Sequence, residues 1–127
     1  MKIIQGNAQH IGNRREQQDD FGFSDMEDAE FTAHGGVIAV LADGMGGMAM
    51  GKEAGRTGVR TMLKTYGAKL PEETISQALK RALLRANQAV FDMADAQGLA
   101  EDAGATLIAA VIYQEMLCWI SVGDSRI

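Results

Sequence analysis

The chain has 127 residues, of which 46% are hydrophobic and 23% are charged, as expected of a globular domain large enough to bury a core. Its formal charge of -5 argues against a general nucleic-acid binder, which would carry a basic patch. The single cysteine, Cys118, rules out an internal disulfide and is interpreted as a small buried apolar residue. The N-terminus lacks the apolar core of a signal peptide and no window could span a membrane, so we expect a cytoplasmic protein.

Strands and loops are predicted for the first third of the chain. Residues 2–11 and 20–24 are predicted to be short strands on either side of a polar loop, and residues 25–36 to form an acidic turn. The uninterrupted apolar run at 37–42 is typical of a strand that is buried on both faces. It ends in the sequence Asp-Gly-Met-Gly-Gly at 43–47, which is too rich in glycine for a strand or a helix.

Two helices are predicted next. From about Lys52, apolar side chains recur with the period of an amphipathic helix. A second helix is predicted from Pro71 to about Gln97, because proline fits the first turn of a helix. Gly98 is expected to end this helix, since glycine readily adopts the backbone conformation that follows a helix.

Two strands are predicted after the helices. They cover Thr106–Tyr113 and Met116–Val122 and are joined by a tight turn at 114–115. The order of strands, two helices and strands predicts an α+β domain in which the helices pack on a sheet.

The strongest chemical signal is Asp43, which follows the buried strand directly. A carboxylate in this position is costly unless something offsets its charge. A hard divalent cation would do so, since magnesium and manganese prefer oxygen ligands. Gly44 would let the backbone turn sharply and bring a carbonyl oxygen close to the same ion. Taken alone, the segment is also explained by an ordinary Asp-Gly turn.

Two further segments place charged side chains in loops. Arg14 and Arg15 precede the paired carboxylates Asp19 and Asp20, and the planar guanidinium group of arginine is well suited to phosphate. A carboxylate nearby can bind a metal ion or its water. The sequence Gly-Asp-Ser-Arg at 123–126 follows the last predicted strand. Alone, each segment is also explained by a solvated charged loop or a surface ion pair.

Together and in this order, these segments resemble the type 2C family of metal-dependent serine/threonine protein phosphatases, in its bacterial form. The family's Asp-Gly-Met-Gly-Gly is matched letter for letter at 43–47, and its Gly-Asp-Ser-Arg at 123–126. Residues 11–19 are similar to the family's N-terminal stretch, and Gly-Ala-Thr at 104–106 is similar to the start of one of its strands. The resemblance covers nearly the whole chain and implies the N-terminal portion of an α/β/β/α sandwich, with antiparallel sheets and two helices.

The resemblance implies a role for each matched residue. Asp43 would bridge two metal ions, Mn²⁺ or Mg²⁺, and Gly44 would add its backbone carbonyl. Asp19 would support the metal centre, Arg14 would hold the substrate phosphate, and Asp124 would help to bind a third, weaker ion. Water activated by two ions would hydrolyse phosphoserine and phosphothreonine in a phosphorylated protein substrate, in opposition to a serine/threonine kinase.

Two residues compete for the phosphate-binding role. Counting back from Asp20 instead of Asp19 selects Arg15 in place of Arg14, although the aromatic residue two positions after Asp19 fits the family pattern better. Gln18 stands where many animal members carry a metal-binding glutamate, and bacterial members often have glutamine there.

Residues 1–127 are expected to form the N-terminal part of a type 2C phosphatase domain that is truncated after Gly-Asp-Ser-Arg, because a complete domain of the family is longer and supplies further metal-binding aspartates. An alternative is a natural half-domain that acts as a binding or regulatory module without catalysis. A third is a small acidic metal-binding domain unrelated to phosphatases. A module that only binds would not need Arg14, Asp19, Asp43 and Asp124 together, which favours an active parent enzyme.

The 127-residue chain by itself is expected to be inactive or nearly so, because it holds only part of a two-metal site. An ion held by few protein ligands keeps most of its water and binds weakly. Uncovered strand edges and an apolar sheet face would also favour self-association.

Overall fold

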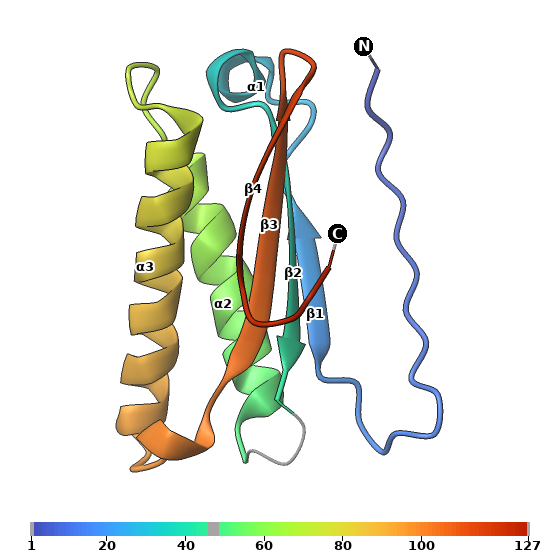
Figure 1. The fold of residues 1–127 in the computed structure, drawn as a ribbon, viewed down its shortest axis with the longest axis vertical. Helices are drawn as coiled ribbons and strands as arrows, with labels where there is room; N and C mark the ends of the chain where they lie inside the picture. Colours follow the sequence, from blue (N-terminus) through green and yellow to red (C-terminus); the bar gives the residue numbers. More distant parts are fainter. Residues whose placement is uncertain (1, 46–48, 127) are drawn as a thin grey trace.

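A computed structural model describes residues 2–45 and 49–126 of the chain. It contains an antiparallel sheet in the order β1-β2-β3-β4, with two long helices, α2 and α3, packed against one face (Figure 1). The strands are β1 (Asp19–Phe23), β2 (Val37–Gly44), β3 (Ala105–Tyr113) and β4 (Met116–Val122). The helices are α1 (Ala29–Gly35), α2 (Gly51–Gly67) and α3 (Ile75–Asp95), followed by the short 3-10 helix η1 (Ala100–Asp102). This architecture confirms the predicted α+β class.

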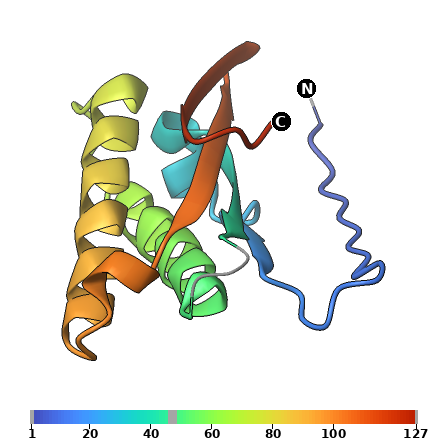
Figure 2. The ribbon, with the colours of Figure 1, turned by 60° about the horizontal axis from the view of Figure 1, so that its bottom comes forward.

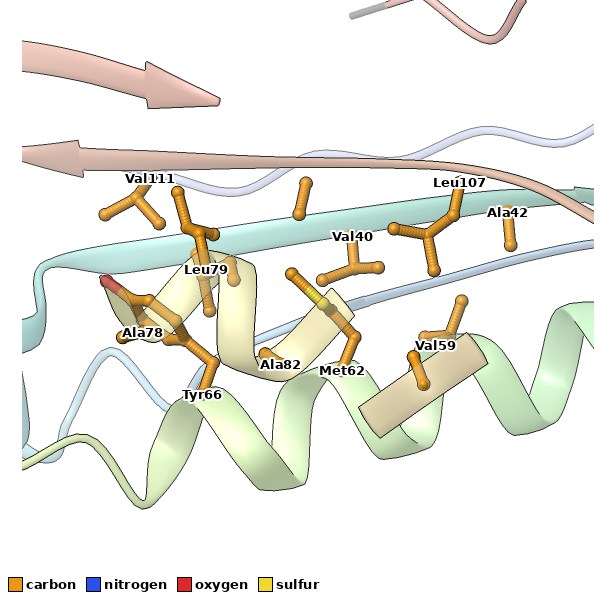
Figure 3. Close-up of a cluster of buried hydrophobic side chains, with 13 residues drawn as sticks. Val40, Ala42, Val59, Met62, Tyr66, Ala78, Leu79, Ala82, Leu107 and Val111 are labelled. Atoms are coloured by element: carbon orange, nitrogen blue, oxygen red, sulfur yellow. The ribbon is translucent and has the colours of Figure 1, made fainter. Parts of the chain in front are cut away.

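The hydrophobic core lies between the sheet and the two long helices. Because successive residues of a strand point to opposite faces, alternate residues of β2 and β3 face the helices. Figure 3 shows Val40 of the sheet next to Met62 of α2 and Leu107 next to Val59, and all four side chains are buried. The core cluster comprises Ile38, Val40, Ala42, Val59, Met62, Tyr66, Ala78, Leu79, Ala82, Ala86, Leu107, Ala109 and Val111.

The helix α3 begins at Ile75, later than the predicted start at Pro71. A capping box sets this start. The Thr74 hydroxyl accepts a hydrogen bond from the Gln77 amide (3.2 Å), and the Gln77 side chain accepts one from the Thr74 amide (3.0 Å). Two donors at the helix N-terminus are thereby satisfied, whereas Pro71 lies in the turn before the helix.

Gly98 ends α3, as predicted. Its φ of 69° is in the left-handed region, and its amide donates to the Asp95 carbonyl (2.9 Å). The Leu99 amide donates to the Ala94 carbonyl (2.9 Å), which completes the pair of hydrogen bonds of a Schellman motif.

Two expectations for the first third of the chain are wrong. Residues 2–11 form no strand, because in the described structure no other strand pairs with them. Residues 25–36 are not a simple turn, since α1 occupies most of this stretch. Asp28 caps that helix by accepting a hydrogen bond from the Phe31 amide (3.0 Å). The Tyr66 hydroxyl then donates to the Gly35 carbonyl (2.7 Å) and fastens α1 to α2.

The hairpin of β3 and β4 matches its prediction closely. Its two connecting residues, Gln114 and Glu115, have φ values of 48° and 66°. Two consecutive positive φ angles are typical of a type I′ turn, whose twist suits antiparallel strands.

The second face of the sheet carries no helix in the described residues. Figures 1 and 2 show the N-terminal segment passing on this side as an extended chain, away from α2 and α3. Leu117 and Trp119 of β4 are 62% and 61% exposed there. The second sheet implied by the family resemblance does not occur within the ranges that the structure describes. Within these same ranges, no helix has the length and hydropathy needed to cross a membrane.

Candidate active site

Three polar residues form a row across one end of the sheet. Antiparallel pairing places Asp19 of β1 opposite Asp43 of β2, and Asp43 opposite Thr106 of β3. Side chains of directly opposite residues lie close together on one face. That face is the one away from the helices, because Ala42, the residue before Asp43, is part of the core. Residues from three separate segments thus meet at one place.

A cavity of about 920 Å³ opens beside this row. Every residue that the sequence analysis assigned to the site contributes to its wall, namely Arg14, Asp19, Asp43, Gly44 and Asp124. Arg15, the alternative phosphate-binding residue, lines it as well, as do Gln18 and Met45. The fold therefore brings together charged side chains of both signs in one hollow.

The electrostatics of the row are unfavourable without a cation. Partial burial, a hydrogen bond with Asp43 and the charge of Asp43 all raise the pKa of Asp19, whereas the nearby charge of Arg14 lowers it. Like charges placed directly opposite each other in a sheet are destabilising. Two carboxylates held side by side, with the cavity open to them, are the donor set that hard divalent cations prefer. The chemistry of these residues therefore fits a divalent metal ion.

The backbone after Asp43 is packed too closely for any side chain at Gly44. A Cβ atom added there would lie 2.3 Å from the Gly51 carbonyl oxygen and 2.9 Å from that of Gln18. The Gly44 amide donates to the same Gln18 carbonyl (3.1 Å), and the Met45 amide donates to the Gly104 carbonyl (3.0 Å). These contacts fix the direction in which the chain leaves β2. Gly46 and Gly47 of the glycine-rich sequence lie outside the described residues.

The arginine-containing loop between residues 10 and 18 is anchored to α2. Lys52 and Glu16 form an ion pair (2.9 Å), which ties the loop to the first turn of that helix. Within the loop, the Gly12 amide donates to Nδ1 of His10 (3.0 Å). His10 and Arg14 of this loop line the cavity.

The loop after β4 brings Asp124 to the cavity. The hydroxyl groups of Ser125 and Thr106 are hydrogen-bonded, which connects this loop to β3. Gly123 has a φ of 90° and leaves no room for a Cβ atom, which would lie 2.7 Å from the Thr106 side chain. Asp124 is therefore held against the same end of the sheet as the carboxylate row.

Thr106 and His10 are among the cavity residues to which the sequence assigned no role. Thr106 belongs to the recognised Gly-Ala-Thr segment, but its position opposite Asp43 follows only from the strand register. No pattern in the sequence marks His10 as a residue of the site. Within the described ranges, no three His, Cys, Asp or Glu side chains gather closely enough to hold a metal ion. The row accordingly offers part of a ligand set.

Comparison with known proteins identifies relatives over most of the chain. A family model described as Protein phosphatase 2C matches residues 7–127. The serine/threonine phosphatase stp of Listeria monocytogenes serovar 1/2a is 33% identical over 92 residues, which cover 70% of this chain and 36% of that protein. The phosphatase of the same name from Listeria innocua serovar 6a matches with the same identity and coverage. The chain therefore spans little more than a third of these curated relatives.

Solved structures share the fold. The crystal structure of the Mycobacterium tuberculosis serine/threonine phosphatase PstP/Ppp matches with a TM-score of 0.68 and 25% identity, over 89% of this chain and 43% of that chain. A structure described as the catalytic domain of the serine/threonine protein phosphatase PstP in complex with two manganese ions matches with a TM-score of 0.66 and 24% identity. It covers 89% of this chain and 44% of that chain. The helices and the antiparallel sheet thus match part of a phosphatase fold, as the fold prediction stated.

Proposed function

This chain belongs to the protein phosphatase 2C family, and on that premise we propose that it supplies the N-terminal part of a domain that removes phosphate from phosphoserine and phosphothreonine in proteins. The observation that carries the proposal is the meeting of Asp19, Asp43 and Arg14 in one cavity. Carboxylates suit divalent cations, and a guanidinium group suits the oxygens of a phosphate. The relatives that extend beyond this segment are serine/threonine phosphatases, which supports the same activity here.

The proposed roles are those that the family resemblance implies, and the position of each side chain supports them. Asp43 stands in the middle of the polar row, where its carboxylate would hold the ions, and the carbonyl of Gly44 would be the adjacent donor. Asp19 adds the second carboxylate, and Asp124 stands on the cavity wall as a donor for a further, weaker ion. Two divalent ions, when bound, supply Lewis-acid charge and an acidified water for in-line hydrolysis.

Arg14 is proposed to hold the phosphate of the substrate. Its guanidinium charge acts on Asp19, so it lies near the carboxylate row. Donors placed around the phosphoryl oxygens neutralise the charge that develops on them during hydrolysis. The substrate is a phosphorylated protein, and a serine/threonine kinase is the enzyme that would supply it.

The proposed function is tested by measuring phosphate release from a phosphothreonine peptide by a chain extended to the full length of its relatives. Activity is expected with Mn²⁺, which is used because a structural neighbour was determined with manganese ions, and Mg²⁺ is compared. Excess chelator should abolish it. Turnover that persists in excess chelator would contradict a metal-dependent mechanism.

Replacing Arg14 with alanine in the extended chain should lower kcat/KM about 10-fold to 100-fold, the usual cost of losing a hydrogen bond to a charged group. Arg15 is the matched control, since it lines the same cavity one residue further along the loop. Arg15→Ala should have the smaller effect. A larger loss in Arg15→Ala would assign the phosphate to Arg15.

The 127-residue chain alone is expected to bind Mn²⁺ weakly and to show almost no turnover. Strand pairing places the carboxylates of Asp19 and Asp43 side by side, and within the described residues no third His, Cys, Asp or Glu joins them closely enough to hold an ion. Two ions close together repel unless several carboxylates hold them. The exposed Leu117 and Trp119 should also favour self-association. Calorimetric titration with Mn²⁺ and size-exclusion chromatography measure both properties. Tight binding of two ions with full turnover would refute this expectation.

A further inference from the structure

Helix α2 carries a row of four cations at every fourth position: Lys52, Arg56, Arg60 and Lys64. The last three side chains are exposed. Among the described residues, the only ion pair found for this row joins Lys52 to Glu16. The helix contains a single acidic residue, so it has a net charge of +3 in a chain whose formal charge is -5. Positive charge is thus concentrated on one element of an acidic protein.

Three cations of the row, Lys52, Arg56 and Arg60, face away from the neighbouring helix. Thr57 and Thr65, each one residue after a cation of the row, contact α3 through hydrogen bonds to Met93 and Arg81. One residue corresponds to a rotation of about 100° around a helix. On the side of the row, Leu63 packs against Gly22 of β1. Lys52, Arg56 and Arg60 therefore lie on the side of α2 that flanks β1, whereas Lys64, seven residues after Thr57, lies nearer to α3.

Local helix stability does not account for this arrangement. Like charges four residues apart are destabilising, and the row contains three such pairs in succession. Glutamate at alternate positions of the row would have replaced this repulsion with attraction. The core of α2, formed by residues such as Val59 and Met62, does not depend on the charges. The fold therefore does not need the exposed cations of α2, whereas a binding role would explain them.

We infer that this row docks an extended acidic segment of the phosphoprotein substrate, an inference that rests on the proposed function. Four-residue steps rise by about 6 Å along the helix axis and turn by about 40°, so the row spans about 18 Å along the axis and winds gradually around α2. Alternate side chains of an extended peptide are spaced by about 6.6 Å and point to the same side. A segment of about seven residues with acidic side chains at every second position matches the four cations in number and in approximate length.

The position of the row links it to the candidate active site. It begins at Lys52, whose partner Glu16 belongs to the loop that carries Arg14. A substrate with its phosphate in the cavity can therefore extend its acidic segment along α2. An acidic peptide fits this surface better than a nucleic acid, because the rest of the chain is strongly acidic and would repel a long polyanion.

The test uses this chain and a fluorescein-labelled, unphosphorylated twelve-residue peptide of alternating glutamate and serine, with binding followed by fluorescence anisotropy. The double variant Arg56→Glu, Arg60→Glu should weaken binding at least tenfold. The matched control is Lys80→Glu, Arg85→Glu, which makes the same change in net charge at exposed positions of α3. The control should bind within about twofold of the original chain, and added salt should weaken binding. Circular dichroism verifies that both variants are folded.

Equal binding by Arg56→Glu, Arg60→Glu and the original chain would overturn the inference, as would equal losses in both double variants. Tighter binding of a single-stranded oligonucleotide of the same charge would assign the row to nucleic acid instead. The peptide measurement needs no hydrolysis, so it fails or succeeds separately from the proposed function. In the extended chain, Arg56→Glu, Arg60→Glu should leave hydrolysis of p-nitrophenyl phosphate unchanged, because that substrate has no acidic segment.

Discussion

Asp43→Asn is expected to lower the phosphatase turnover of the extended chain at least a hundredfold, which is about the cost of removing one essential electrostatic contact from an active site. Asparagine keeps the shape of the side chain but removes its negative charge. Asp43 lies between Asp19 and Thr106, so no other described carboxylate occupies the middle of the row. The measurement is the rate of Mn²⁺-dependent phosphate release, together with Mn²⁺ affinity from calorimetry.

Asp20→Asn is the matched control for this variant. Asp20 is also an aspartate in β1, but it pairs with Ala42 and therefore points toward the helix side of the sheet. Its replacement removes one charge without altering the cavity, so turnover and Mn²⁺ affinity should be nearly unchanged. If Asp43→Asn kept more than a tenth of the original turnover, the proposed central role of Asp43 would be wrong.

The same variant should alter the pH dependence of stability of the metal-free chain. The pKa of Asp19 is raised above its usual value in the folded state by partial burial and by Asp43. A carboxyl group with a raised pKa stabilises the fold below its unfolded pKa, and this contribution is lost as the pH rises through the folded pKa. Asp43→Asn removes the neighbouring charge, so urea unfolding should show a smaller loss of stability as the pH rises above 3.8, the ordinary value for aspartate.

Gly44→Ala is expected to destabilise the fold by about 1–3 kcal/mol, the usual range for overpacking a tightly packed site. The added Cβ atom would lie 2.3 Å from the Gly51 carbonyl oxygen. It would also lie 2.9 Å from the Gln18 carbonyl oxygen, and neither backbone atom can move as freely as the end of a side chain. The end of β2 must shift, so phosphatase turnover of the extended chain should fall together with stability.

Gly67→Ala provides the control, because nothing lies within 4 Å of the position of its added Cβ atom. Gly67 is the last residue of α2, and alanine is the better helix former. Urea unfolding should therefore show unchanged or slightly higher stability for Gly67→Ala and a clear loss for Gly44→Ala. Equal stability of the two variants would show that the chain around Gly44 can adapt without cost.

Local patterns in the sequence were sufficient to predict several helices and strands of this protein. The apolar run at 37–42, the helical period after Lys52 and the hairpin at 106–122 are encoded by neighbouring residues, and each forms the predicted element. The start of α3 is also encoded locally, in the capping box of Thr74 and Gln77. The prediction placed the start at Pro71 instead, because proline is common in the first turn of a helix. The short helix α1 was missed because an acidic stretch of this length is also typical of a turn.

Strand pairing, in contrast, was decided only by the tertiary structure. Residues 2–11 have a composition that permits a strand, but a strand also needs a partner for its backbone groups, and none is present in the described structure. The sequence identified Asp19, Asp43 and Asp124 as candidate site residues one by one. The register of β1, β2 and β3 decided that Asp19, Asp43 and Thr106 form one row. Short-range interactions select helices and strands, but proximity between distant residues is set by packing of the whole sheet.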